Sequence, residues 1–336
     1  MRIGVTCFAV AALTVSLSSP AQASGITLTA AGIADGFTTS TFAVTNPGYN
    51  SCCDGPFGVA ITNNGTVIVG TGAGTVYDFS DIDGQTPGTA LHTTSVAPGG
   101  GQAYASVGGQ AYGGINFTSF VQYNSDGSVN HVLSDVTATP FRGMWGDPTS
   151  GDIFSTSNEG LIRIDPLANG GLGAFTVINA SINPDSVGPD GLAVSPNGTS
   201  LYVEFNGAIN AVNSVTGAVT HTWGGFNSPD GAAVISGGAF DGYIIVNNNN
   251  GEIDLLNPAT GGFIPIGNQA TRGDFVAPDV SNGTLLLTYS DAVERLGIAS
   301  GSIGGGPAAP EPSTLALFGI ALGGFGLIRR RVAKKM

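Results

Sequence analysis

Acidic side chains recur in a short turn motif that could bring oxygen ligands together. Pro-Asp-Gly occurs twice, with Asp190 and Asp230 at its centre, and Pro-Asp-Val places Asp279 in a similar setting. Glu204 and Asn206 follow a hydrophobic run, where another turn is expected. Carboxylate and amide oxygens suit Ca²⁺, so these five residues predict a metal site if their turns share one face. The alternative is that Pro-Asp-Gly only supplies turn chemistry, because Asp readily bonds its own backbone.

Histidine offers little support for catalysis. His131 and His221 occupy the same position of a Gly-x-Val-x-His pattern, which indicates an exposed outer strand, and His92 is the only other histidine. Without a histidine base, neither a Ser-His-Asp nor a Cys-His catalytic set is expected.

Two cysteines are adjacent, at Cys52 and Cys53, and the third, Cys7, lies in the N-terminal leader. Two neighbouring cysteines cannot by themselves form a tetrahedral zinc site. Thiols of exported proteins tend to be oxidised, so the pair predicts a vicinal disulfide. Its role is either a rigid turn or a contact with a ligand or redox partner.

Composition excludes several classes of protein. The 336 residues include 54 Gly and 18 Pro, and 42% are hydrophobic, which is enough to bury a core and excludes general disorder. Only 10% are charged, which argues against a helical bundle or coiled coil. Residues 24–310 contain 22 acidic residues and four basic ones, a net charge of −18. Such a surface repels phosphate, so nucleic acid is not an expected partner.

The N-terminus has the pattern of a cleavable signal peptide over residues 1–23. Arg2 precedes an apolar run over residues 5–17, and the segment ends in Ala21-Gln22-Ala23. Signal peptidase accepts small residues at the positions of Ala21 and Ala23, so cleavage is predicted after Ala23. The apolar run is too short to span a bilayer. The chain is therefore expected to be exported.

The C-terminus predicts a transient stop in the membrane. A Gly/Pro/Ala-rich linker is predicted at 300–309, and an apolar run covers residues 315–328. As a helix, this run would be about 21 Å long, less than the roughly 30 Å of membrane hydrocarbon. The flanking residues are Pro310, Glu311, Pro312, Ser313 and Thr314 before the run, and Arg329, Arg330 and Arg331 after it. The arginines would hold that end on the cytoplasmic side.

This tail, over residues 310–336, strongly resembles the PEP-CTERM sorting signal of Gram-negative bacteria that make exopolysaccharide. The resemblance implies processing by exosortase, a membrane transpeptidase that depends on cysteine, with cleavage near Pro-Glu-Pro. It further implies transient insertion in the inner membrane and delivery to the cell surface or extracellular matrix. Exopolysaccharide and other surface proteins are then the candidate partners. The alternative is an ordinary C-terminal membrane anchor.

Between the two ends, short runs rich in β-branched and aromatic residues recur between Asn-Gly, Asp-Gly and Gly-Gly turns, which indicates strands and hairpins. Similar units begin at Pro56, Phe141, Pro189, Pro229 and Pro278, and another lies within 103–136. A period of about 40–45 residues with four strands per unit predicts an all-β propeller of six four-stranded blades over residues 24–299. The last unit lacks a fourth strand, which residues 37–44 could supply. A β-sandwich or a β-helix is the alternative.

The repeat over residues 189–266 resembles an NHL-type blade, in which a turn leads into the strand nearest the central channel. That order predicts Arg142, Asp190, Asp230 and Asp279 at one mouth of the channel. The sorting tail and the lack of a catalytic set favour a non-enzymatic binding platform for polysaccharide or protein. The alternative is a Ca²⁺-dependent lactonase or lyase, because the propellers resembling gluconolactonases and streptogramin lyases hold a divalent ion at this mouth. No residue of the chain stands out as its general base.

Overall fold

The computed structural model describes residues 25–49, 55–96, 103–116, 118–182, 191–268 and 271–304. The predicted signal peptide, Cys52 and Cys53, Asp190 and the sorting tail lie outside these residues. Within the described ranges, no helix is long and apolar enough to cross a membrane.

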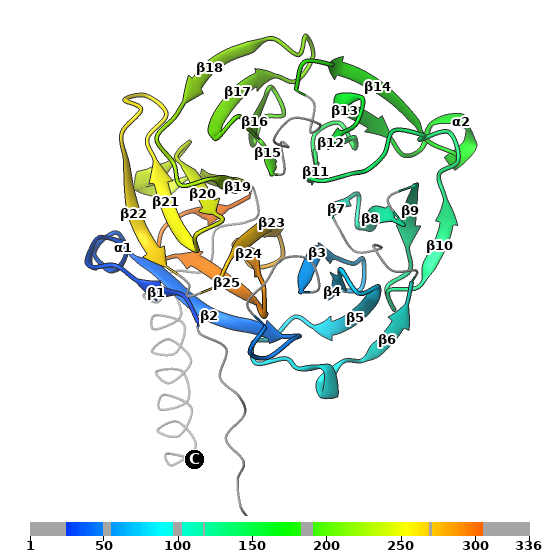
Figure 1. The fold of residues 1–336 in the computed structure, drawn as a ribbon, viewed down its shortest axis with the longest axis horizontal. Helices are drawn as coiled ribbons and strands as arrows, with labels where there is room; N and C mark the ends of the chain where they lie inside the picture. The colour runs from blue at the N-terminus through cyan, green and yellow to red at the C-terminus, as the bar shows by residue number, and fades with distance from the viewer. Residues whose placement is uncertain are drawn as a thin grey trace, which may run out of the picture.

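Six antiparallel sheets surround a common axis, and each forms a blade of four strands that follow one another from the centre outward (Figure 1). Blade 1 contains β3 (Pro56–Ile61), β4 (Thr66–Thr71), β5 (Thr75–Ser80) and β6 (His92–Ser95). Blade 2 contains β7 (Tyr104–Val107), β8 (Gln110–Ile115), β9 (Ser119–Tyr123) and β10 (Val129–Val132). Blade 3 contains β11 (Met144–Gly146), β12 (Ile153–Ser157), β13 (Gly160–Asp165) and β14 (Ala174–Asn179).

The remaining blades follow the same order. Blade 4 contains β15 (Leu192–Val194), β16 (Ser200–Phe205), β17 (Ala208–Asn213) and β18 (Val219–Trp223). Blade 5 contains β19 (Pro229–Ser236), β20 (Ile244–Asn248), β21 (Glu252–Leu256) and β22 (Phe263–Asn268). Blade 6 contains β23 (Gly273–Asp279), β24 (Thr284–Tyr289), β25 (Ala292–Ile298) and β2 (Phe37–Val44). Two short strands, β1 (Thr27–Leu28) and β26 (Ser302–Ile303), extend the sheet of blade 5. The short helices are α1 (Ala30–Ala34) and α2 (Ala168–Gly171), with 3₁₀ turns at Pro87–Thr89 and Gly238–Phe240.

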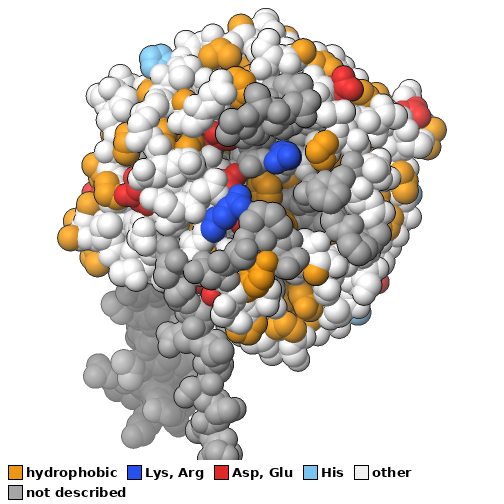
Figure 2. All heavy atoms as spheres, viewed as in Figure 1, with side chains coloured by type: hydrophobic (Ala, Val, Ile, Leu, Met, Phe, Trp, Pro, Cys, Tyr) orange, Lys and Arg blue, Asp and Glu red, His pale blue; other side chains and the backbone are white. Residues whose placement is uncertain are grey.

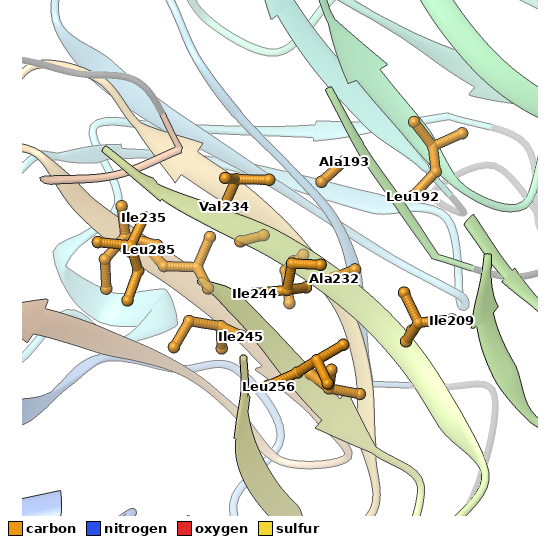
Figure 3. Close-up of a cluster of buried hydrophobic side chains, with 14 of the residues drawn as sticks. Leu192, Ala193, Ile209, Ala232, Val234, Ile235, Ile244, Ile245, Leu256 and Leu285 are labelled. Carbon is orange, nitrogen blue, oxygen red and sulfur yellow. The ribbon is translucent and has the colours of Figure 1, made fainter. Parts of the chain in front are cut away.

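Strands near the axis are hydrophobic on both faces because each sheet packs between two others. Every residue of the inner strand β19 is buried except its last, and every residue of β25, the third strand of blade 6, is buried as well. The outer strands differ, since only Trp223 of β18 is buried. Figure 3 shows part of the largest core cluster, in which side chains of β15, β19, β20 and β24 interdigitate between blades 4, 5 and 6.

The N-terminal strand β2 closes the ring by pairing with β25, from Phe37 opposite Ile298 to Val44 opposite Ala292. Blade 6 is therefore built from both ends of the described chain, as Figure 1 shows in blue and orange. Closure pairs the outer edge of β25, which would otherwise present free backbone groups. The predicted closing segment, residues 37–44, is confirmed to its exact bounds.

The antiparallel order divides the loops between two faces of the ring. On the start face, defined here as the side where the inner strands β3, β7, β11, β15, β19 and β23 begin, the second strand of each blade turns into the third. On the end face, defined as the side where the inner strands finish, the first strand turns into the second. Between the faces, the channel narrows to a cavity of about 10 Å³, lined in part by Phe57, Tyr104 and Met144. This volume holds about one water molecule, so side chains nearly close the channel.

The predicted six-bladed propeller is confirmed, but two boundaries differ from the sequence analysis. The last blade does not begin at Pro278, because β23 starts at Gly273 and ends at Asp279. The predicted linker at 300–309 also begins later than expected. Residues Ser302 and Ile303 form β26, which pairs with Ser236 and Ile235 of β19. The last described residues therefore belong to the ring.

A close contact between blades 1 and 2 makes a glycine necessary at residue 70. A Cβ on Gly70 would lie 2.2 Å from the Oη atom of Tyr104, which is buried. We expect Gly70→Ala to lower the free energy of unfolding by about 1–3 kcal/mol, since the ring cannot move without repacking. The matched control is Gly88→Ala, because that glycine is exposed and its nearest neighbour would be 3.8 Å away. Urea denaturation should show a change within about 0.5 kcal/mol for the control; equal losses would contradict this account.

Candidate functional site

The centre of the start face carries a buried network of opposite charges. Arg272 directly precedes β23, and its Nη2 atom lies 3.1 Å from Oδ2 of Asp230 and 3.0 Å from Oδ1 of Asp274. The carboxylates are only 1% and 3% exposed, whereas the arginine side chain is 31% exposed. The guanidinium group therefore links the start of β19 to the start of β23. Its positive charge offsets the repulsion between the two carboxylates.

Asparagines at the end of β20 complete this network. Nε of Arg272 donates to Oδ1 of Asn249, and Nδ2 of Asn247 donates to the carbonyl oxygen of Asp274 at 2.8 Å. Tyr289 in turn donates its hydroxyl to Oδ1 of Asn247 at 3.1 Å. Gly273 is required here, because a Cβ would lie 2.6 Å from that same Oδ1 atom. Blades 5 and 6 are thus tied together by hydrogen bonds around one arginine.

Three other predicted residues also lie on the start face, each near the end of a strand. Arg142 is exposed two residues before β11, and its backbone N–H donates to Thr156. Glu204 is buried near the end of β16, and its Oε1 atom accepts from the backbone N–H of Gly207 at 3.3 Å. Asn206 has φ +54° in the turn to β17, a left-handed conformation that asparagine tolerates. Asn206 therefore acts first as a turn residue.

Asp279 lies on the opposite side of the molecule, so its predicted place beside Asp230 is wrong. It ends β23 instead of leading into it, and its carboxylate is fully buried. Oδ2 of Asp279 accepts from Nη1 of Arg295, and Oδ1 accepts from the hydroxyl of Ser281 at 2.5 Å. The error arose because Asp is favourable in turns at either end of a strand.

Arg295 forms a second charged cluster on the end face. Its Nη2 atom lies 2.6 Å from Oδ1 of Asp81, and its Nε atom lies 2.8 Å from Oδ1 of Asp83. Burial disfavours the charged guanidinium, but its hydrogen bonds and the charge of Asp279 raise the pKa of Arg295. Burial also raises the pKa of Asp81, against the hydrogen bond from Arg295. This cluster joins blade 6 to the loop after β5.

The five predicted metal ligands do not form one site. Asp279 is on the end face, Asp190 lies outside the described residues, and Asp230 is paired with Arg272. Within the described ranges, no group of three or more His, Cys, Asp or Glu residues could hold a metal ion. A guanidinium beside Asp230 supplies the positive charge that a divalent cation would otherwise bring. Asp230 and Asp279 therefore cannot both belong to the one predicted Ca²⁺ site.

Arg272 and Asp274 were not among the predicted site residues, although the sequence contains one signal that points to Arg272. Arg142-Gly143 and Arg272-Gly273 are both Arg-Gly pairs immediately before or within the start of an inner strand. Figure 2 shows basic side chains beside the hollow centre of one face, with acidic side chains next to them. Residues 24–310 contain only four arginines and no lysine, so the occurrence of two of them in Arg-Gly pairs at the start of inner strands was a signal for the start face.

The end face has more open space than the channel. A cavity of about 340 Å³ is lined by the ends of inner strands from blades 1, 2, 3 and 6, and by Gly304. Trp145, Pro148 and Pro278 contribute part of its apolar wall. The Trp145 side chain is only 2% exposed. Trp145 is mainly part of the hydrophobic core.

Comparison with known proteins identifies the tail and the fold. Residues 308–331 match the PEP-CTERM protein-sorting motif, and no curated protein matches the chain. A gluconolactonase structure from Xanthomonas campestris is similar with a TM-score of 0.58 and 16% identity, over 83% of this chain and 96% of that chain.

Two other solved structures are similar at the level of fold. The WD40 domain of Doa1 has a TM-score of 0.50 and 16% identity, over 72% of this chain and 78% of that chain. A chain of the mitotic checkpoint complex has a TM-score of 0.51 and 15% identity, with coverages of 71% and 74%. Such low identities show a common fold and no more. The likeness to NHL-type blades stays a prediction.

Removing the arginine of the start face should destabilise the ring. Arg272→Met would leave the buried carboxylates of Asp230 and Asp274 facing each other, so we expect a loss of about 2–4 kcal/mol in the free energy of unfolding at pH 7. Arg163→Met is the matched control, because Arg163 pairs with Asp152 at 3.0 Å but is 47% exposed. Because Arg163→Met leaves one uncompensated carboxylate instead of two that face each other, its loss should be smaller than that of Arg272→Met in the same urea titration. A control that loses as much as Arg272→Met would show that burial of the charges is unimportant.

Proposed function

We propose that this protein is exported, processed by exosortase and presented at the cell surface or in the extracellular matrix, where its propeller serves as a non-enzymatic binding platform. The observation that carries the proposal is the PEP-CTERM motif at residues 308–331, attached to a β-propeller. The ligand class is exopolysaccharide or another surface protein. Signal peptidase and exosortase are the partners during export.

The chemistry of the two ends supports this route. Residues 1–23 have the charge, apolar run and small residues that signal peptidase recognises. The apolar run at 315–328 is short for a permanent span, and the arginines that follow it favour the cytoplasmic side. A segment that stops briefly in the membrane would present Pro310-Glu311-Pro312 to a membrane enzyme.

The design of the ring supports a binding role over catalysis. The buried carboxylates at the start face are held by Arg272, and the channel behind them is nearly closed by side chains. Blades joined by such contacts make a rigid body whose loops can differ without changing the core. The 340 Å³ cavity of the end face provides a place where a ligand group could insert.

Replacing Pro310-Glu311-Pro312 with three alanines tests the sorting step, and it preserves the length of the chain. We expect the wild-type protein to lose its tail and to reach the surface or the medium, whereas the variant keeps the tail and stays in the membrane fraction. Mass spectrometry of the C-terminus and blots of the cell fractions measure the two results. Pro307→Ala is the control, because residue 307 lies outside the matched motif. The same mass and distribution for all three proteins would refute processing at this motif.

The likeness to the Xanthomonas gluconolactonase favours a second candidate, a Ca²⁺-dependent lactonase or lyase. Because Arg272 lies against Asp230, we expect the heat of Ca²⁺ titration measured by calorimetry to be unchanged when Asp230 is replaced. Wild type, Asp190→Ala and Asp230→Ala should behave alike, and Asp241→Ala, on an exposed loop of the end face, serves as the matched control. Saturable binding lost only in Asp190→Ala and Asp230→Ala would instead support the enzyme.

A further inference from the structure

A carboxylate of blade 6 is fully buried with no positive charge paired to it among the described residues. Glu294 lies on β25, and its two side-chain oxygens are 3.0 and 3.1 Å from Oγ1 of Thr41 on β2. A backbone N–H, that of Ile26, also donates to the carboxylate. These donors are neutral, and a buried charge with only neutral partners is costly.

The charged groups around Glu294 make that cost larger. Asp291 follows β24 and Asp83 lies in the loop after β5, and both act on Glu294 by repulsion. Tyr289 on β24 is close enough for the charge of Glu294 to raise the pKa of its hydroxyl, which burial raises more. Arg295 is adjacent in sequence, but its guanidinium is held by Asp81, Asp83 and Asp279. Burial is the largest cause that raises the pKa of Glu294, to about 8.

The beginning of the described chain lies directly over this carboxylate. β1 pairs with β22, Thr27 opposite Asn268, and Oγ1 of Thr39 donates to the carbonyl oxygen of Ile26 at 3.3 Å. The segment therefore bridges the outer strands of blades 5 and 6. A Cβ placed on Gly25 would lie 3.7 Å from Oε2 of Glu294 and 3.4 Å from Oγ1 of Thr41. Residue 25 is thus in van der Waals range of the buried oxygen.

Cleavage after Ala23 would create a positively charged α-ammonium group on Ser24, the residue that precedes Gly25. Ser24 would become the first residue, and bond lengths keep its α-nitrogen within about 5 Å of the Cα atom of Gly25. We propose that Glu294 is the binding site for the α-ammonium group that signal peptidase creates at Ser24. The inference rests on the export and the cleavage position proposed above.

This pairing would make the stability of the closed ring depend on processing. In the precursor, the chain continues beyond Ser24 as a neutral peptide, so no ammonium group is available to Glu294. After cleavage, an ion pair with charge-assisted hydrogen bonds replaces a carboxyl group that is costly to ionise. The N-terminal segment then holds blades 5 and 6 together more strongly. The ring is therefore most stable after the protein has crossed the membrane.

Two chains that differ only in their first residue test the pairing without depending on export. One begins at Ser24 and the other at Ala21, and both are released from a fusion partner by a protease that leaves no extra residue. The additional three residues move the ammonium group by up to about 10 Å. At pH 7.5, we expect the chain that begins at Ala21 to melt about 2–4 °C lower. The measurement is thermal unfolding followed by circular dichroism.

Glu294→Gln, introduced into both chains, is the control that isolates the charge. The amide keeps an oxygen for Thr41 and for the N–H of Ile26, so the two chains should then melt within about 1 °C of each other. Equal melting temperatures with Glu294 in place, or the same difference after Glu294→Gln, would overturn the proposal.

The dependence on pH gives a second readout. In the chain that begins at Ala21, the folded pKa of Glu294 lies above the unfolded value, so the folded state holds the proton more tightly and stability falls as the pH rises from about 4.5 to 8. In the chain that begins at Ser24, the ammonium group should suppress this loss. The difference in melting temperature should therefore grow between pH 5 and pH 7.5. A difference that does not change with pH would contradict an ion pair.

The N-terminal mass of the exported protein separately tests whether signal peptidase makes Ser24 the first residue in the cell. A first residue of Ser24 is the expected result. A different first residue would overturn the pairing in the cell and leave export itself intact, whereas retention inside the cell would refute the proposed function. The melting experiment stands apart from both results because it uses chains of defined start.

Discussion

The ring is stable only when it is closed, because every blade must bury both faces of its sheet against its neighbours. All residues of β25 are buried, and this strand would be an open edge without β2 from the N-terminal part of the chain. Closure therefore joins residues about 250 positions apart, and its entropic cost is offset by completing the packing around the whole ring. Residues 25–28 add to this closure, because they pair with β22 of blade 5 and bind Thr39 on β2 of blade 6.

Two of the four arginines of the body lie where the ring brings acidic residues of different blades together. Arg272 pairs with Asp230 of blade 5 and Asp274 of blade 6 on the start face. On the end face, Arg295 pairs with Asp279 of its own blade and with two aspartates from the loop after β5. In a body with a net charge of −18, Arg272 and Arg295 each relieve repulsion at a junction between blades. Assembly of the ring is sufficient to explain both clusters.

Much of the architecture could be predicted because each blade repeats local signals. Asn-Gly turns and β-branched runs indicated the strands of blades 4 and 5, and the missing strand of the last unit indicated closure by residues 37–44. The candidate site was predicted less well. Asp230 was placed correctly on the start face, but Asp279 was assigned to the wrong end of its strand, and Arg272 was overlooked. Turn chemistry does not say which end of a strand a turn adjoins, since Asp favours both.

The sequence alone predicted the N-terminal signal peptide, and it determined the C-terminal sorting motif, the excess of negative charge and the all-β repeat, because each of these depends on residues close together in the chain. Only the tertiary structure decided which charges meet. Arg272 reaches Asp230 across 42 positions, and Gly25 covers Glu294 across more than 250. Those encounters depend on the angle between blades and on where each strand begins, and no local pattern encodes them. Asp230 and Asp279, which looked like metal ligands in the sequence, are partners of Arg272 and Arg295 in the folded ring.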